Sequence, residues 1–129
     1  MSSGEAERQM APILAAHGFH LDAVDSDLVY GERPAWAVFY RGPDCKLQVC
    51  WSAREGGADF MLAPLGAPNE FGLVNQSKKW RFMLALSDID DELGLPPMVG
   101  GDDALWAWRK ALFDTHIEAA RAALLSGER

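Results

Sequence analysis

The sequence predicts a single α+β domain spanning residues 1–129, and three observations support this. The length suits one domain, and the middle of the chain holds short apolar segments separated by turn-forming residues. From residue 101 onwards, apolar side chains recur at helical spacing. We therefore expect an N-terminal helix, an antiparallel β-meander of three or four strands, a connecting helix, and a long C-terminal helix packed on the sheet in two layers.

The first predicted element is a helix from about Glu5 to His17. Gly18 supplies its stop. Pro12 leaves an alternative open, because proline is tolerated in the first turn of a helix, and a shorter helix would place it there. The apolar and aromatic positions that recur at helical spacing are Met10, Ile13, Leu14 and His17.

Residues 19–31 predict an irregular strand at an edge of the sheet. They mix apolar side chains with acidic ones and contain a break near Asp25-Ser26. Charges and bends of this kind protect an edge strand from pairing with other chains. The acidic residues are Asp22, Asp25 and Asp27.

Three strands, at residues 34–42, 45–53 and 57–65, form the predicted meander. The separators Pro43-Asp44 and Glu55-Gly56 carry turn chemistry. If each loop has two residues, the opposed pairs of the first hairpin are Trp36–Trp51, Val38–Val49 and Tyr40–Leu47. Those of the second hairpin are Trp51–Phe60 and Val49–Leu62. All of these side chains then lie on one apolar face, because side chains alternate with period two.

The opposite face of this sheet mixes apolar and polar side chains. Such a face fits contact with a partner or a second copy of the chain, and it equally fits partial cover by a second helix. Its residues are Ala37, Phe39, Gln48, Cys50, Ser52, Asp59, Met61 and Ala63.

Residues 66–79 predict a loop, followed by a helix over 80–93 that has Ser77 as a candidate N-cap and Gly94-Leu95-Pro96-Pro97 as its stop. Residues 80–87 equally fit a buried strand, since periodicity does not separate the two in so short a segment. The positions at helical spacing are Phe82, Leu86, Ile89 and Leu93.

The last predicted helix runs from Gly101 to about Leu125, with Asp102 and Asp103 favourable at its start. Its two apolar stripes indicate burial on more than one side. Because Trp106 and Trp108 are two positions apart, they cannot fill the same core pocket. The stripes are Leu105, Trp108, Leu112, Ala119 and Ala123, and Trp106, Phe113, Ile117, Ala120 and Leu124.

The charge of −7 and pI of about 4.8 disfavour binding to nucleic acid or to an anionic membrane. The one basic cluster, at residues 78–81, is better suited to flanking a helix start or to contacting an acidic patch on a partner. No stretch approaches the roughly 20 apolar residues of a membrane helix. Glu5 and Glu7 stand where a secretory signal has basic residues, so we expect a cytoplasmic protein.

Searches for chemistry predict no catalytic, cofactor-binding or metal-binding residue. His17 and His20 lack further ligands to complete a zinc site, and residues 88–92 lack the later positions of a calcium loop. Cys50 has no basic neighbour to activate it. Cys45 and Cys50 lie on one strand about 16 Å apart, too far to form a disulfide.

Several segments together resemble small uncharacterised bacterial α+β proteins, some of which are proposed as toxin-immunity proteins. The segments are His17-Gly18-Phe19, an irregular strand ending at Tyr30-Gly31, a turn at 53–56 and Leu62-Ala63-Pro64. The resemblance covers about residues 13–66. It implies a bacterial binding protein and assigns no functional residue.

We therefore expect a non-enzymatic, immunity- or chaperone-like protein whose partner is another protein, basic in character, or a second copy in a homodimer. One alternative is a small-molecule-binding or enzymatic domain, with a pocket between sheet and C-terminal helix lined by Trp36, Trp51, Trp106 or Trp108. Another is a homodimer resembling secretion chaperones. The candidate interaction surface comprises Phe39, Cys50, Met61, Lys79, Trp80, Trp106 and Trp108.

Overall fold

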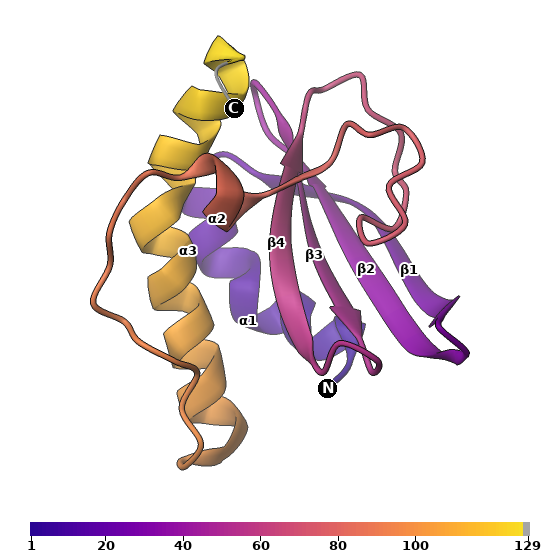
Figure 1. The fold of residues 1–129 in the computed structure, drawn as a ribbon, viewed down its shortest axis with the longest axis vertical. Coiled ribbons are helices and arrows are strands. Elements are labelled where there is room, and N and C mark those ends of the chain that lie inside the picture. Colours follow the sequence, from indigo (N-terminus) through magenta and orange to yellow (C-terminus); the bar gives the residue numbers. More distant parts are fainter. Residues whose placement is uncertain (128–129) are drawn as a thin grey trace.

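The computed structural model describes residues 1–127 and confirms the α+β fold (Figure 1). Its five strands form one antiparallel sheet in the order β1-β2-β3-β4-β5. Helices α1 and α3 cover one face, and the loop between β4 and β5 lies over the other. The elements are α1 (Ser3–Ala16), β1 (His20–Tyr30), β2 (Arg33–Arg41), β3 (Lys46–Ser52), β4 (Gly57–Ala63), β5 (Arg81–Phe82), α2 (Met83–Leu86) and α3 (Gly101–Ser126).

Helix α1 begins earlier than expected because Ser2 caps it. The Ser2 hydroxyl accepts a hydrogen bond from the backbone N–H of Glu5 at 3.1 Å. Pro12 lies inside the helix rather than in its first turn, so the shorter-helix alternative is wrong. Proline is tolerated here because Pro12 and Arg8 are both exposed, and water can satisfy the Arg8 carbonyl that loses its partner.

Strand β1 is the irregular edge strand that the sequence predicts. It pairs only with β2, and its register shifts between Leu21 and Ala23 and again between Asp25 and Leu28. The second irregularity contains the predicted break. Such bulges twist an edge and hinder the addition of a further strand.

The first hairpin has the predicted register, with Trp36 opposite Trp51 and Tyr40 opposite Leu47. Its turn closes where the N–H of Gly42 donates to the carbonyl of Cys45 at 2.9 Å. The two-residue loop at Pro43-Asp44 is therefore correct.

The predicted pairs of the second hairpin are wrong by two residues: Trp51 faces Ala58, and Val49 faces Phe60. The turn spans residues 53–56. The Ser52 hydroxyl accepts the N–H groups of Arg54 and Glu55 at 3.1 and 3.3 Å, which favours this longer turn. Because side chains alternate with period two, the shift by two residues leaves the predicted apolar face intact.

The helix-covered face carries the first core, which α1, α3 and the sheet enclose. The opposite face carries a second core beneath residues 64–80. Gln48 fastens this cover: its Nε2 donates to the Glu70 carbonyl at 3.1 Å, and its Oε1 accepts from Gly72 N–H at 3.0 Å. A loop therefore covers the mixed sheet face. The sequence predicts either contact with a partner or cover by a second helix at this face.

The predicted helix over residues 80–93 is mostly wrong. Residues 81–82 form the short strand β5, and α2 ends after a single turn at Leu86. Ser77 caps no helix; its N–H and hydroxyl both donate to Glu70. The strand alternative holds for β5, which pairs with only two residues of β4.

Helix α3 confirms the expected C-terminal helix. Its N-cap is Gly100 rather than an aspartate, and Gly127 at φ +72° terminates it. Trp106 is buried in the first core, whereas Trp108 packs against that core and is half-buried. No helix within residues 1–127 has both the length and the apolar character needed to cross a membrane.

Candidate interaction surface

Most of the predicted interaction residues are internal. Phe39, Cys50, Met61 and Trp80 belong to the second core, beneath the loop that Gln48 fastens. Trp106 is buried in the first core. The expected surface is thus not exposed at these five residues. Of the other two, Lys79 is exposed and Trp108 is half-buried.

Four of the five tryptophans contribute to the first core: Trp36 and Trp106 are buried in it, and Trp51 and Trp108 pack against it. Trp36 and Trp51 stack with ring centroids 6.1 Å apart, and the Arg109 guanidinium lies 4.8 Å from the Trp106 ring. Arg109 is buried, and burial lowers the pKa of its guanidinium. None of these tryptophans lines the cavities described below.

An unpaired strand edge lies elsewhere, on β4. Strand β5 pairs only with Met61 and Leu62. Within residues 1–127, residues 57–60 therefore have β3 on one side and no strand on the other. The edge is open because the chain turns into α2 directly after Phe82. Figure 1 shows β4 as the labelled strand nearest to α3.

Two hollows flank this open edge, one on each face of the sheet. The apolar hollow, about 220 Å³, lies towards α2 and α3 and is lined by Phe60, Leu84 and Leu112. The acidic hollow, about 450 Å³, lies towards the covering loop and is lined by Glu55 and Leu73. Ala58, Asp59 and Phe82 border both hollows.

The rims of the hollows combine exposed apolar side chains with unpaired carboxylates. Phe82 and Leu84 are 42% and 51% exposed. Burial, and then the negative charge of Glu55, raise the pKa of Asp59. The positive charge of Arg109 offsets part of this rise. Neither Asp59 nor Glu55 forms an ion pair in the described part of the chain. A cationic group arriving here would relieve this repulsion.

A Ser–His–Asp arrangement lies on the outer side of α3. Ser87 Oγ is 2.7 Å from His116 Nδ1, and His116 Nε2 is 2.5 Å from Asp91 Oδ2. The Ser87 hydroxyl also accepts the N–H of Ile89 at 3.3 Å. Through these hydrogen bonds, the three groups tie the irregular segment after α2 to α3.

His17, which the sequence analysis considered as a zinc ligand, also contacts α3 but is separate from this arrangement. His17 lies 3.6 Å from Asp114 and 3.3 Å from Glu118. Across residues 1–127, no group of three or more His, Cys, Asp or Glu side chains is placed to hold a metal ion.

The sequence predicts the strand at residues 57–65 and places Asp59 on the mixed sheet face, but it does not predict that the edge of this strand stays unpaired over residues 57–60. For Phe82 it favours a helix, with a strand over residues 80–87 as the alternative. Periodicity alone does not show where β5 ends. Comparison of the chain with known protein families, with curated proteins and with solved structures finds no match.

Proposed function

We propose that this chain is a non-enzymatic, immunity- or chaperone-like protein that binds an extended segment of a basic partner protein along the open edge of β4. The observation that carries the proposal is the unpaired stretch at residues 57–60, with an apolar hollow on one face and an acidic hollow on the other. A peptide that adds to a sheet edge gains main-chain hydrogen bonds, and pockets on the two faces select its alternate side chains.

The two hollows specify the chemistry of the partner. Side chains of an added strand point to opposite faces in turn. One would enter the apolar hollow against Phe60, Leu84 and Leu112, and the next would lie beside Glu55 and Asp59. The preferred segment therefore alternates apolar and basic residues. The net charge of −7 would also speed its association with a basic partner.

Strand β4 suits this role better than β1, the other edge of the sheet. The exposed aspartates and two register shifts of β1 protect it from strand addition. A second copy of the chain is the weaker occupant of the β4 edge, because two-fold pairing would bring Glu55 and Asp59 near their own copies. The basic partner and the homodimer predict different masses for the complex.

The first experiment is selection of random peptides on the intact chain. We expect peptides with alternating apolar and basic residues, and their binding should shift the amide NMR signals of residues 57–60. The double variant E55K/D59N should lose the preference for basic residues, whereas Glu32→Lys, an exposed charge reversal in the β1–β2 turn, should keep it. Peptides without a basic preference, or shifts elsewhere, would contradict the proposal.

The second experiment captures the natural partner. The wild-type chain should bind the partner more strongly than Leu84→Lys does, because the substitution places a charge at the mouth of the apolar hollow. Val29→Lys is the matched control, since Val29 is exposed on the other edge strand. We expect one stoichiometric partner with wild type and the control, and its loss with Leu84→Lys. Light scattering that shows a homodimer through this edge would replace the basic partner with a second copy.

A further inference from the structure

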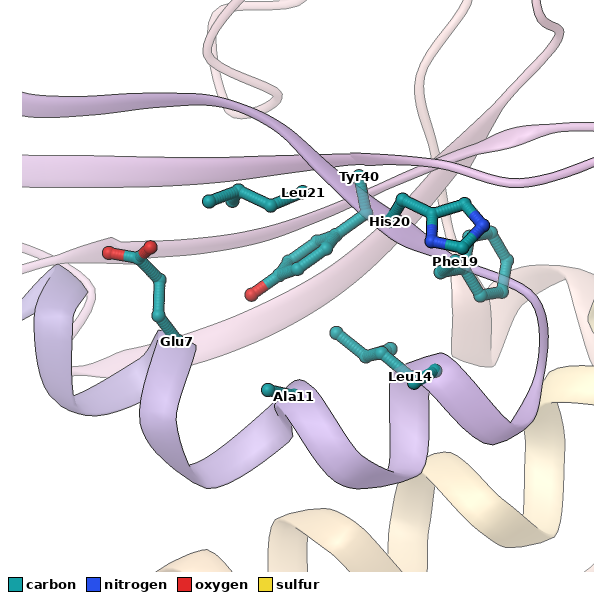
Figure 2. Close-up of a pocket in the computed structure, with 8 residues that line it drawn as sticks. Glu7, Ala11, Leu14, Phe19, His20, Leu21 and Tyr40 are labelled. Atoms are coloured by element: carbon teal, nitrogen blue, oxygen red, sulfur yellow. The ribbon is translucent and has the colours of Figure 1, made fainter.

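A cavity of about 260 Å³ lies between α1 and the β1 side of the sheet (Figure 2). Its walls are mainly apolar, formed by Ala11, Leu14 and Ala15 of α1, with Phe19 and Leu21. Its polar groups are Glu7, His20 and Tyr40. Leu21 is largely exposed, so the cavity opens to solvent beside it.

The Tyr40 hydroxyl is the unusual feature of this cavity. Tyr40 is only 3% exposed, yet its hydroxyl has no hydrogen-bond partner among the residues that the structure describes. Figure 2 shows the hydroxyl pointing across the space towards α1, between Glu7 and Ala11. Buried polar groups in folded proteins are nearly always hydrogen-bonded, so this hydroxyl calls for a partner from outside the chain.

Glu7 determines which kind of partner fits. Burial and then the negative charge of Glu7 raise the pKa of Tyr40, so the carboxylate acts on the hydroxyl across the cavity. Glu7 forms neither an ion pair nor a side-chain hydrogen bond within residues 1–127. A group between them that donates hydrogen bonds and carries positive charge would satisfy both the Glu7 carboxylate and the Tyr40 oxygen. An ammonium, with three donors and no acceptor, meets both needs.

We propose that this cavity binds a small primary ammonium compound with an apolar body. The body packs against Leu14, Ala11 and Leu21, and the ammonium donates to the Glu7 carboxylate and to Tyr40 Oη. His20 lies at the far end of the cavity from Glu7, away from this charge (Figure 2). The volume is below the roughly 300–1,000 Å³ of pockets for drug-sized ligands, so a single ring or a short alkyl chain fits.

The test titrates the intact chain with 2-phenylethylammonium chloride and follows the backbone amide NMR signals. Two matched probes keep the ring and change the head group: neutral 2-phenylethanol and anionic phenylacetate. We expect saturable shifts at residues lining the cavity. The ammonium should bind about tenfold more tightly than the alcohol, as charge-assisted hydrogen bonds imply, and phenylacetate should not bind.

Variants separate the roles of the lining residues. Glu7→Gln should weaken ammonium binding about tenfold and remove the preference over the alcohol. Tyr40→Phe should weaken it less, and Ala11→Phe should block it by filling the cavity. Glu92→Gln, an exposed carboxylate on the segment after α2, is the control and should bind as wild type does.

Three results would overturn the proposal: no saturable shift, equal binding of phenylacetate, or unchanged binding to Ala11→Phe. The three probes on the wild-type chain decide the question even if a variant fails to fold. The outcome does not depend on the β4 edge, so it is independent of the proposed function.

Discussion

His116 Nε2 and Asp91 Oδ2 lie 2.5 Å apart, and this contact ties α3 to a segment with no regular secondary structure. When Nε2–H donates to Asp91, the other ring nitrogen accepts the hydroxyl proton of Ser87 at 2.7 Å. Both nitrogens of this buried ring are then satisfied. We infer that the hydrogen bonds among Ser87, His116 and Asp91, called the clasp below, determine where residues 87–93 cross the helix.

The clasp predicts a specific response to acid. The hydrogen bond from His116, and then that from the Leu93 N–H, lower the pKa of Asp91 below its ordinary value. The contribution of Asp91 to the free energy of unfolding is present above about pH 4, the pKa of this carboxyl in the unfolded chain. It is lost as pH falls through the lower pKa of the folded chain. Asp91→Asn should therefore show a shallower loss of unfolding free energy below about pH 4 than wild type.

Urea unfolding followed by tryptophan fluorescence across this pH range measures the effect. Asp90→Asn is the matched control, because Asp90 is the neighbouring carboxylate and is exposed. Equal acid slopes for wild type and Asp91→Asn would show that the clasp does not contribute.

Alkaline pH should destabilise the protein through its buried thiols. Burial, and then the charge of Asp44, raise the pKa of Cys45 to about 12, and burial likewise raises the pKa of Cys50. For both thiols the pKa is higher in the folded chain than in the unfolded chain. Their contribution to the free energy of unfolding is therefore fully present below about pH 8.5, and it declines as pH rises through the unfolded pKa towards the folded one. Cys45→Ala should reduce the steepness of this decline.

Thiol reactivity gives an independent measurement of the same burial. Both cysteines are fully buried, so a thiol reagent should react with them slowly in the native chain and rapidly in denaturant. Rapid modification of the native chain would contradict their placement.

Tyr40→Phe should stabilise the free protein. The ring packs in the first core, whereas the hydroxyl is buried without a partner. Removing a buried, unsatisfied hydroxyl while keeping the ring should raise the free energy of unfolding by about 1 kcal/mol. Urea unfolding in buffer free of amines measures this. A loss of stability would show that the hydroxyl has a partner, such as an ordered water molecule.

Gln48→Leu should loosen the loop over the second core. The substitution keeps the side-chain volume but leaves the Glu70 carbonyl and the Gly72 N–H without their partners. We expect a loss of about 2–4 kcal/mol in unfolding free energy. Amide hydrogen exchange should become faster across residues 66–79, and Cys50 should become reactive to thiol reagents. Lys79→Gln, an exposed change in the same loop, should alter neither.

Local patterns in the sequence were sufficient for the elements whose structure depends on near neighbours. The two-residue turn at Pro43-Asp44 determines the first hairpin, and the period-two pattern identifies the apolar face. The 3.6-residue periodicity identifies α3, and the aspartates of residues 22–27 identify β1 as an edge strand. In each case the determining interactions lie within one element or one turn.

The second hairpin shows where local reasoning was insufficient. The sequence predicts a two-residue turn at Glu55-Gly56, but the Ser52 hydroxyl stabilises a longer one. The apolar face survived only because the displacement was an even number of residues. Competing turns differ by single hydrogen bonds, and composition does not rank them.

Tertiary structure alone decided which surfaces are exposed. The mixed sheet face became a second core because Gln48, in β3, bonds to a loop 22 and 24 residues further along the chain. Phe82 became a surface residue because β5 stops after two residues, which left the β4 edge open. Contacts between segments this distant depend on how the whole chain folds, and the unpaired edge and cavities they leave have no counterpart in any local pattern.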